Sequence, residues 1–274
     1  MRVEARGLTF EVRTGGPEDG EPVLLLHGFP QHAGEWDEVT PALHGAGLRT
    51  YALDQRGYSP GARPTEVGEY RIPELVADAA AVLDALGVTA AHLVGHDWGA
   101  IVAWGLAAAH PERVRTLTAV SVPHPAAMGH ALATDPRQKA RSSYIALFRK
   151  PGKAEKVLLA FRAATLRRML AGVGDAARVA RYAEPMREPG ALTAALNWYR
   201  AMTGADMKAV GPVGVPTTFV WSDQDVAIGR TAAEACATHV TGDFRFEVLS
   251  GVTHWIPDEA PGPLAAAILA RAGR

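Results

Sequence analysis

The stretch Gly95-His96-Asp97-Trp98-Gly99-Ala100 decides the fold of this chain. An apolar run at residues 93–94 stops at Gly95, and an apolar pattern with helical spacing starts just beyond Gly99. The chain must therefore turn sharply from a strand into a helix. Glycines flank the middle residue because so tight a turn leaves no room for neighbouring Cβ atoms. The turn presents one polar side chain at its tip, and that side chain is Asp97.

The composition describes an ordinary globular protein with a small-molecule partner. The chain has 274 residues, 21% charged and 48% apolar, with a net charge of -1. This length suffices for one large domain with an insertion, and the charge balance argues against nucleic acid as a partner. The single cysteine, Cys236, fits a reducing compartment, and the N-terminus has no apolar leader pattern. We therefore expect a cytoplasmic protein that binds no membrane and is a monomer or homodimer.

Strands and helices alternate on both sides of the Asp97 turn. Apolar or alternating segments at residues 8–12, 22–26, 49–53, 91–95, 117–122, 216–221 and 244–249 predict strands. Helical patterns at residues 73–86, 98–109 and 230–239, and from about residue 263, separate them, and residues 35–44 predict a helix that Pro41 interrupts. This rhythm predicts a doubly wound, mostly parallel sheet, which places the chain in the α/β class.

Between residues 126 and 210 the strand rhythm is absent. Helical segments are predicted near residues 137–148, 153–169, 176–183 and 191–202 instead. We interpret residues 126–210 as an inserted helical cap, and residues 1–125 and 211–274 as the core domain.

Ligands of open α/β sheets bind beyond the carboxyl ends of the strands. Four polar groups follow predicted strands: the loop at residues 27–30, Asp97, the loop at residues 222–225, and His254. Along the chain their order is nucleophile, acid, histidine, as expected of α/β-hydrolases. The chain resembles the α/β-hydrolase superfamily over its whole length. Within it, His27-Gly28-Phe29-Pro30, the stretch at residues 95–100 and two cap motifs described below resemble the epoxide hydrolases.

Asp97 is the expected nucleophile. An aspartate at the start of a helix is also a good N-cap, but a cap requires neither flanking glycine. Attack of a carboxylate on an ester would give only a mixed anhydride. A carboxylate can instead displace a leaving group from a saturated carbon, which gives an alkyl-enzyme ester that water cleaves. The reaction class is therefore epoxide opening or dehalogenation.

Hydrolysis of this ester requires a base, an acid that orients the base, and donors for the negative charge that develops on the ester oxygen. His254 is the only one of ten histidines in a loop after the last predicted strand. Asp225 matches the family position of the acid that orients it, and Asp223 is the rival, better explained as a turn residue. The resemblance also implies that the backbone N–H groups of Phe29 and Trp98 form an oxyanion hole, although residues 27–30 could equally be just a tight turn.

The cap offers two tyrosines for the leaving oxygen. Tyr144 begins a segment that resembles the YxxxFQxPG motif of epoxide hydrolases, with Arg149 in place of the usual glutamine, and Tyr199 lies in a match to their NWYR motif. A tyrosine hydroxyl, with a pKa of roughly 10, is a suitable acid for an alkoxide, whereas a halide needs only weak donors. Each tyrosine alone could be a packing residue of an amphipathic helix. Two in matching motifs favour a role in the reaction.

The first hypothesis is an epoxide hydrolase that converts a small apolar epoxide and water into a vicinal diol, with no metal and no cofactor. The alternative is a haloalkane dehalogenase with the same Asp97, His254 and Asp225, and a third is a non-catalytic receptor that would have lost a member of this triad. Haloalkane dehalogenases usually carry asparagine where this chain has Phe29. The expected pocket-lining residues are Phe29, Trp36, Trp98, Leu147, Trp198 and Trp255.

Overall fold

Strand β5 (Ala91–His96) leads into the Asp97 turn and lies within an eight-stranded sheet of order β1-β2-β4-β3-β5-β6-β7-β8. The computed structural model describes residues 1–274. The remaining strands are β1 (Arg2–Ala5), β2 (Leu8–Gly15), β3 (Glu21–Leu26), β4 (Leu48–Leu53), β6 (Val114–Val120), β7 (Thr217–Ser222) and β8 (Phe244–Leu249). The β1–β2 and β2–β4 pairs are antiparallel, and all pairs from β4 through β3, β5, β6 and β7 to β8 are parallel. The predicted mostly parallel sheet is confirmed.

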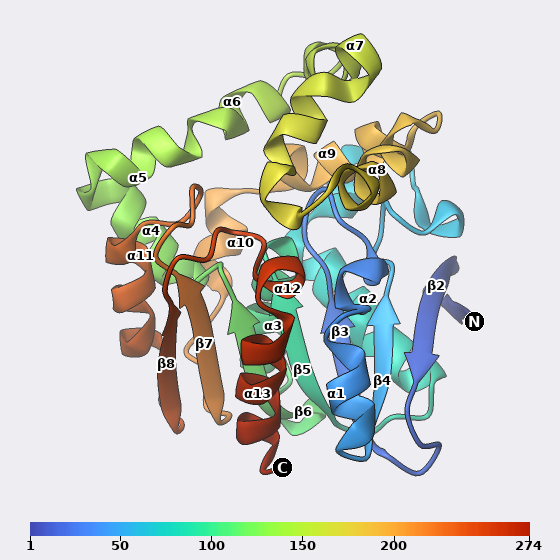
Figure 1. Ribbon diagram of the computed structural model, residues 1–274, viewed down its shortest axis with the longest axis vertical. Coiled ribbons are helices and arrows are strands. Elements are labelled where there is room, and N and C mark those ends of the chain that lie inside the picture. The colour runs from blue at the N-terminus through green and yellow to red at the C-terminus, as the bar shows by residue number, and fades with distance from the viewer.

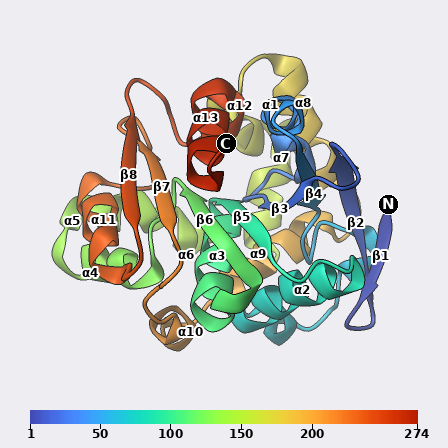
Figure 2. The same cartoon turned by 90° about the horizontal axis from the view of Figure 1, so that it is seen from below.

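Helices cover both faces of the sheet, which explains why every residue of the central strands β5 and β7 is buried. Helices α1 (Thr40–Gly45) and α13 (Pro261–Ala272) lie on one face, and α2 (Ile72–Ala85) and α3 (Trp98–Ala109) lie on the other (Figure 2). Two separate hydrophobic clusters result, one under α1 and α13 and a larger one that joins α2, α3 and the region between β6 and β7. The short helices α11 (Arg230–Glu234) and α12 (Ile256–Glu259) complete this part of the fold.

The regular elements between β6 and β7 are all helices. They include α4 (Pro125–Thr134), α5 (Pro136–Arg141), α6 (Ile145–Phe148), α7 (Lys153–Met169), α8 (Ala176–Ala183), α9 (Ala191–Ala201) and α10 (Gly204–Ala209). Helices α6 to α9 lie across the carboxyl ends of the strands (Figure 1). Any site at these strand ends is therefore covered by this insertion.

The sequence patterns miss some elements. Helix α4 follows Val122-Pro123-His124-Pro125, where two prolines make a helix start hard to recognise, yet Pro125 takes a first-turn position and the His124 ring accepts a hydrogen bond from Ala126 N at 3.2 Å. Helix α10 and the edge strand β1 were also not predicted. The helix expected at residues 35–44 is split into a 3-10 turn (Ala33–Trp36) and α1, whose first turn holds Pro41. None of the helices is both long and apolar enough to span a bilayer.

Candidate active site

Asp97 sits at the tip of the turn between β5 and α3 with φ 51° and ψ −115°, a conformation that L residues rarely adopt. The turn is this tight because two glycines pack against backbone. A Cβ on Gly95 would lie 2.8 Å from Ala100 N, and one on Gly99 would lie 2.8 Å from His27 O. Both glycines are therefore needed for the turn, as the sequence predicts.

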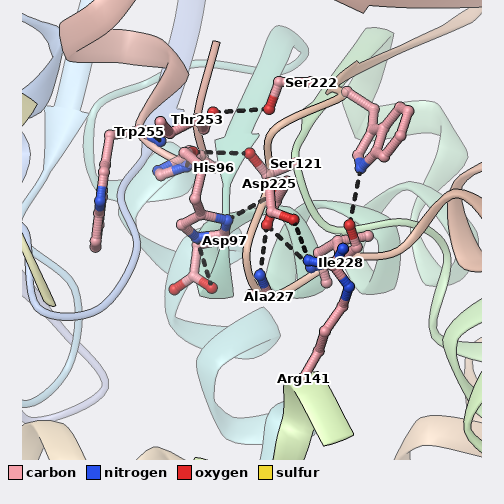
Figure 3. Close-up of polar contacts among 12 residues, drawn as sticks. His96, Asp97, Ser121, Arg141, Ser222, Asp225, Ala227, Ile228, Thr253 and Trp255 are labelled. Atoms are coloured by element: carbon pink, nitrogen blue, oxygen red, sulfur yellow. Dashed lines mark hydrogen bonds and ion pairs between the residues drawn. The ribbon is translucent and has the colours of Figure 1, made fainter. Parts of the chain in front are cut away.

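Asp97, His254 and Asp225 are brought together from three separate loops. Nδ1 of His254 donates a hydrogen bond to Oδ2 of Asp225 at 2.8 Å, and Nε2 of His254 lies 3.6 Å from Oδ2 of Asp97 (Figure 3). The other oxygen of Asp225 accepts hydrogen bonds from the backbone N–H groups of Ala227 and Ile228 at 2.7 and 2.9 Å. All three side chains are buried. This arrangement fixes the imidazole between two carboxylates.

Asp223 lies in the same loop but outside this group. Its carboxylate accepts hydrogen bonds from Ser250 Oγ at 2.7 Å and from Gly251 N at 2.8 Å, so it closes the turn between two strand ends. It makes no contact with His254. The geometry favours Asp225 over Asp223 as the partner of the imidazole.

The charges of this group shift its pKa values in opposite directions. Burial alone lowers the pKa of His254, but the carboxylates of Asp225 and Asp97 outweigh this effect and raise it to about 10. Burial alone raises the pKa of Asp97, but the hydrogen bond and charge of His254 and the N–H of Phe29 leave it below its usual value. An ionised carboxylate thus faces an imidazolium.

The loop that carries His254 is held by groups at the ends of the neighbouring strands. Nε2 of His96 and Oγ of Ser121 both donate to the carbonyl oxygen of His254, at 2.9 and 3.0 Å, and Oγ of Ser222 donates to the carbonyl of Thr253 at 2.7 Å (Figure 3). Burial lowers the pKa of His96 to about 4, so its ring is neutral. His96 positions the backbone of the loop and does not reach Asp97 with a hydrogen bond.

The Phe29 backbone N–H donates to Oδ1 of Asp97 at 2.8 Å. The peptide bond between Phe29 and Pro30 is cis. Trp98, the second expected donor, makes no backbone hydrogen bond to Asp97. Because Trp98 is the first residue of α3, its N–H has no partner inside the helix. One of the two expected oxyanion donors is thus engaged with the carboxylate in this structure.

A cavity of about 280 Å³ opens above Asp97. Tyr144, which precedes α6, and Tyr199 of α9 both line it, together with Asp97 and His254. The two tyrosine rings lie 6.3 Å apart between centroids. Burial first, and then the charge of Asp97, raise the pKa of Tyr144 above its usual value; burial, with Tyr144 and Asp97, does the same for Tyr199. Both hydroxyls remain protonated at neutral pH and are available as donors.

Arg149 connects the two segments that carry these tyrosines. It stands where the YxxxFQxPG motif of epoxide hydrolases has glutamine. Its Nε donates to the carbonyl of Tyr199 at 2.9 Å and its Nη2 to that of Met202 at 2.6 Å. A cation here also suits the C-terminal end of α9. The substitution therefore keeps a link between α6 and α9.

Four of the six expected lining residues do not line the cavity, whereas Phe29 and Trp255 do. Trp36 is fully buried on the opposite face of the sheet, in the cluster under α1 and α13. The rings of Trp98 and Trp198 pack against each other, with centroids 5.5 Å apart and planes tilted by 47°, and the indole of Trp198 donates to the carbonyl of Arg56. Leu147 packs against the larger hydrophobic cluster. These corrections concern side-chain direction, which residue type alone does not specify.

The cavity also contains residues that sequence reasoning missed, namely Arg141, Met169, Val226 and Ala227. Val226 and Ala227 directly follow Asp225, so their proximity to the site could have been predicted. Arg141 lies three residues before Tyr144, a spacing that places both on one side of the chain where it is helical. No group of three or more His, Cys, Asp or Glu side chains is arranged to hold a metal ion.

A carboxyl group that was also missed lies behind the site. Glu35 is buried and its Oε2 lies 3.4 Å from Nδ1 of His96. Burial, with the charges of Asp258 and Asp97, raises the pKa of Glu35 well above its usual value. The contact with Glu35 supports the His96 ring at Nδ1, while Nε2 of the same ring donates to the carbonyl oxygen of His254.

Comparison with known proteins gives the family. The model of the alpha/beta hydrolase fold family matches residues 21–261. The AB hydrolase superfamily protein YfhM of Bacillus subtilis is 36% identical over 266 residues, which cover 94% of this chain and 92% of that protein. Epoxide hydrolase A of Mycobacterium tuberculosis is 34% identical, and the match covers 97% of this chain and 95% of that protein.

Solved structures of epoxide hydrolases are also similar to this chain. An epoxide hydrolase from Bacillus megaterium in complex with an inhibitor superimposes over the full length of both chains with a TM-score of 0.91 at 25% identity. Epoxide hydrolase A from Mycobacterium thermoresistibile gives a TM-score of 0.87 at 28% identity, covering 99% of this chain and 97% of that one. This chain therefore belongs to the α/β-hydrolase fold family and, within it, to the epoxide hydrolases.

Proposed function

We propose that this protein hydrolyses an epoxide to a vicinal diol through a covalent ester on Asp97. A carboxylate oxygen of Asp97 attacks a ring carbon, and the bond from that carbon to the ring oxygen breaks. Tyr144 and Tyr199 hydrogen-bond the departing oxygen, which takes up a proton. Water then attacks the carbonyl carbon of the ester, and His254 removes one proton from this water. As the acyl bond breaks, the departing alkoxide takes the second proton of the water from the new carboxyl group, and the diol is released. Asp97 is regenerated, and the sum is epoxide plus water giving diol.

The charges around His254 support this order of steps. With Asp97 ionised, the two carboxylates raise the pKa of His254 to about 10, and the ring carries a proton that prevents it from acting as a base. Ester formation converts Asp97 into a neutral group and so removes one of the charges that hold this proton. The ring oxygen takes its proton from a tyrosine hydroxyl, and the proton that the imidazolium then gives up restores this hydroxyl. His254 thus becomes a base only once there is an ester to hydrolyse.

The single observation that carries the proposal is the pair Tyr144 and Tyr199 in the same cavity as Asp97. An alkoxide leaving group must be hydrogen-bonded as it forms, and two neutral hydroxyls meet this need. A halide leaving group would need neither. Phe29, next to Asp97, has no side-chain donor for a halide. The epoxide chemistry is therefore favoured over the dehalogenase alternative.

We also propose that residues 126–210 act as a cap on a core formed by residues 1–125 and 211–274. The proposal is supported by the origin of the site residues. The core contributes Asp97, Asp225 and His254, and the insertion contributes both tyrosines. Two buried hydrogen bonds join the parts, from Trp198 Nε1 to Arg56 O at 2.9 Å and from the Tyr182 hydroxyl to Asp258 Oδ1 at 2.8 Å. The cap would thus select the leaving group, while the core supplies the covalent chemistry.

A panel of three substrate types tests the proposal. Purified protein is incubated with styrene oxide, 1-chlorobutane and p-nitrophenyl acetate, and diol, chloride and nitrophenolate are measured. We expect diol formation that exceeds chloride release by several orders of magnitude. Chloride release without diol formation would replace the proposal by the dehalogenase alternative, and turnover of the aryl ester alone would contradict the role of Asp97.

Replacement of both cavity tyrosines by phenylalanine is expected to lower kcat/KM for styrene oxide by about 10³-fold or more, because the alkoxide then forms without a donor. Each single replacement should have a smaller effect. The measurement is steady-state diol formation together with the rate of ester formation in a single turnover. Tyr70→Phe is the matched control, because Tyr70 is also buried but donates to the Pro64 carbonyl outside the cavity. Normal ester formation in the double variant would argue against the assigned role.

A further inference from the structure

One guanidinium, that of Arg141, lines the cavity, and the proposed reaction does not use it. Arg141 ends α5 and lies one turn of chain before Tyr144. It borders both the cavity above Asp97 and a neighbouring polar depression on the surface. Its side chain extends from the helix toward the loop that holds Asp225 (Figure 3). Arg141 therefore stands where the cavity meets the surface.

The charge of Arg141 has no anionic partner. Its one hydrogen bond runs from Nη1 to the backbone carbonyl of Asp225 at 2.5 Å. No carboxylate lies within 4 Å of it, whereas Arg56, Arg71 and Arg271 each form an ion pair at 2.6 Å or less. A guanidinium has five N–H donors, so most of those on Arg141 remain available. The side chain is anchored, yet its positive charge is not neutralised.

The segment around Arg141 is rich in basic residues. Residues 136–153 contain six basic residues and no acidic one: Arg137, Lys139, Arg141, Arg149, Lys150 and Lys153. The whole chain has a net charge of -1, so the segment is strongly positive against a nearly neutral background. Of these six, only Arg141 lines the cavity above Asp97, whereas Lys139, Arg149 and Lys150 line a separate surface pocket. The polar depression beside Arg141 also contains acidic side chains, so the positive charge at the cavity itself is that of Arg141.

Such a charge matters only for a substrate that carries an anion. A neutral epoxide gains little from it, whereas a carboxylate that enters the cavity would be repelled by the ionised Asp97. Arg141 opposes this repulsion and can bind the carboxylate in a charge-assisted, bidentate manner. The other newly found lining residues, Met169, Val226 and Ala227, are apolar and suit the body of the same molecule.

We propose that Arg141 is a specificity-determining residue that binds a carboxylate at the end of the substrate remote from the epoxide. The natural substrates are then small epoxy acids with an apolar body, because the cavity holds only about 280 Å³. This refines the small apolar epoxide expected from the composition by adding one negative charge. The inference rests on the proposed epoxide hydrolase function.

Two substrates of matched shape test it: para-oxiranylbenzoate, which carries a carboxylate, and para-oxiranylbenzamide, which is neutral. The readout is the ratio of their kcat/KM values. We expect the native protein to prefer the benzoate by about 10- to 100-fold, the range that charge-assisted hydrogen bonds contribute. Arg141→Gln should bring the ratio close to one, through a higher KM for the benzoate. Arg141→Lys should keep part of the preference, since it retains the charge without the bidentate geometry.

Lys139→Gln is the matched control, because it removes an equal charge from the same helix at a residue that does not line the cavity. The ratio should stay near its native value in this variant. An equal rate with both substrates in the native protein, or an equal loss for both in Arg141→Gln, would overturn the inference and leave Arg141 as a support of the Asp225 loop. Failure of the native protein to hydrolyse either epoxide would instead contradict the proposed function.

Discussion

Replacement of Asp97 by alanine is expected to abolish diol formation, with a loss in kcat of about 10⁴-fold or more. The reason is that no other carboxylate reaches the cavity: the second oxygen of Asp225 is held by two backbone N–H groups, and Asp223 closes a turn outside the site. Without Asp97 no ester can form, and His254 has no ester to hydrolyse. The measurement is diol production at saturating styrene oxide.

The same variant allows a check on electrostatics. Because the charge of Asp97 helps to raise the pKa of His254 to about 10, its removal should lower that pKa. Titration of the imidazole signals by NMR measures this shift directly. Asp223→Asn is the control, since it changes a carboxylate in the Asp225 loop outside the cavity, and it should retain turnover. Substantial turnover by the Asp97 variant, in a protein with native circular dichroism, would reject the covalent mechanism.

Replacement of His254 by alanine is expected to separate the two steps. The carboxylate of Asp97 keeps its hydrogen bond from Phe29 N and can still attack, so the ester forms but hydrolysis lacks its base. Turnover should fall by about 10³-fold or more while the enzyme accumulates as the ester. Mass spectrometry of the digested protein should find the added mass of one substrate molecule on the peptide that contains Asp97.

Two further proteins make this result unambiguous. A variant that lacks both Asp97 and His254 should acquire no adduct, which excludes alkylation elsewhere. His110→Ala, a change at an exposed histidine that directly follows α3, should turn over normally without a lasting adduct. If the His254 variant stays unmodified while it binds substrate, then His254 is needed for the first step, and the order of steps proposed above is wrong.

The sequence is informative wherever the backbone itself constrains the residue type. The tight turn at Asp97 requires Gly95 and Gly99, and both are visible in the sequence as a pattern. The loops that carry Asp225 and His254 follow apolar strands, so topology brings them to the same edge of the sheet. The mostly parallel sheet and the helical nature of residues 126–210 follow from the hydrophobic rhythm for the same reason.

Side-chain direction and long-range contacts lie beyond such patterns. Trp36 is a large aromatic residue of the kind that often lines pockets. It lies instead in the 3-10 turn at Ala33–Trp36, where it is buried in the hydrophobic cluster under α1 and α13. Arg141 looks like any surface arginine until the fold shows that no carboxylate lies near it. Strand β1 has only four residues, and pairing with β2 supports it, so its local signal is weak.

The backbone of Asp97 has a thermodynamic consequence that is independent of its chemistry. With φ at 51° and ψ at −115°, the residue is held in a conformation that costs an L amino acid about 1–3 kcal/mol and costs glycine little. Glycine normally makes a folded chain less stable than alanine does. At this position the order should reverse, so that the inactive Asp97→Gly protein melts at a higher temperature than the inactive Asp97→Ala protein. The fold therefore accepts a local loss of stability at Asp97, the residue proposed as the nucleophile.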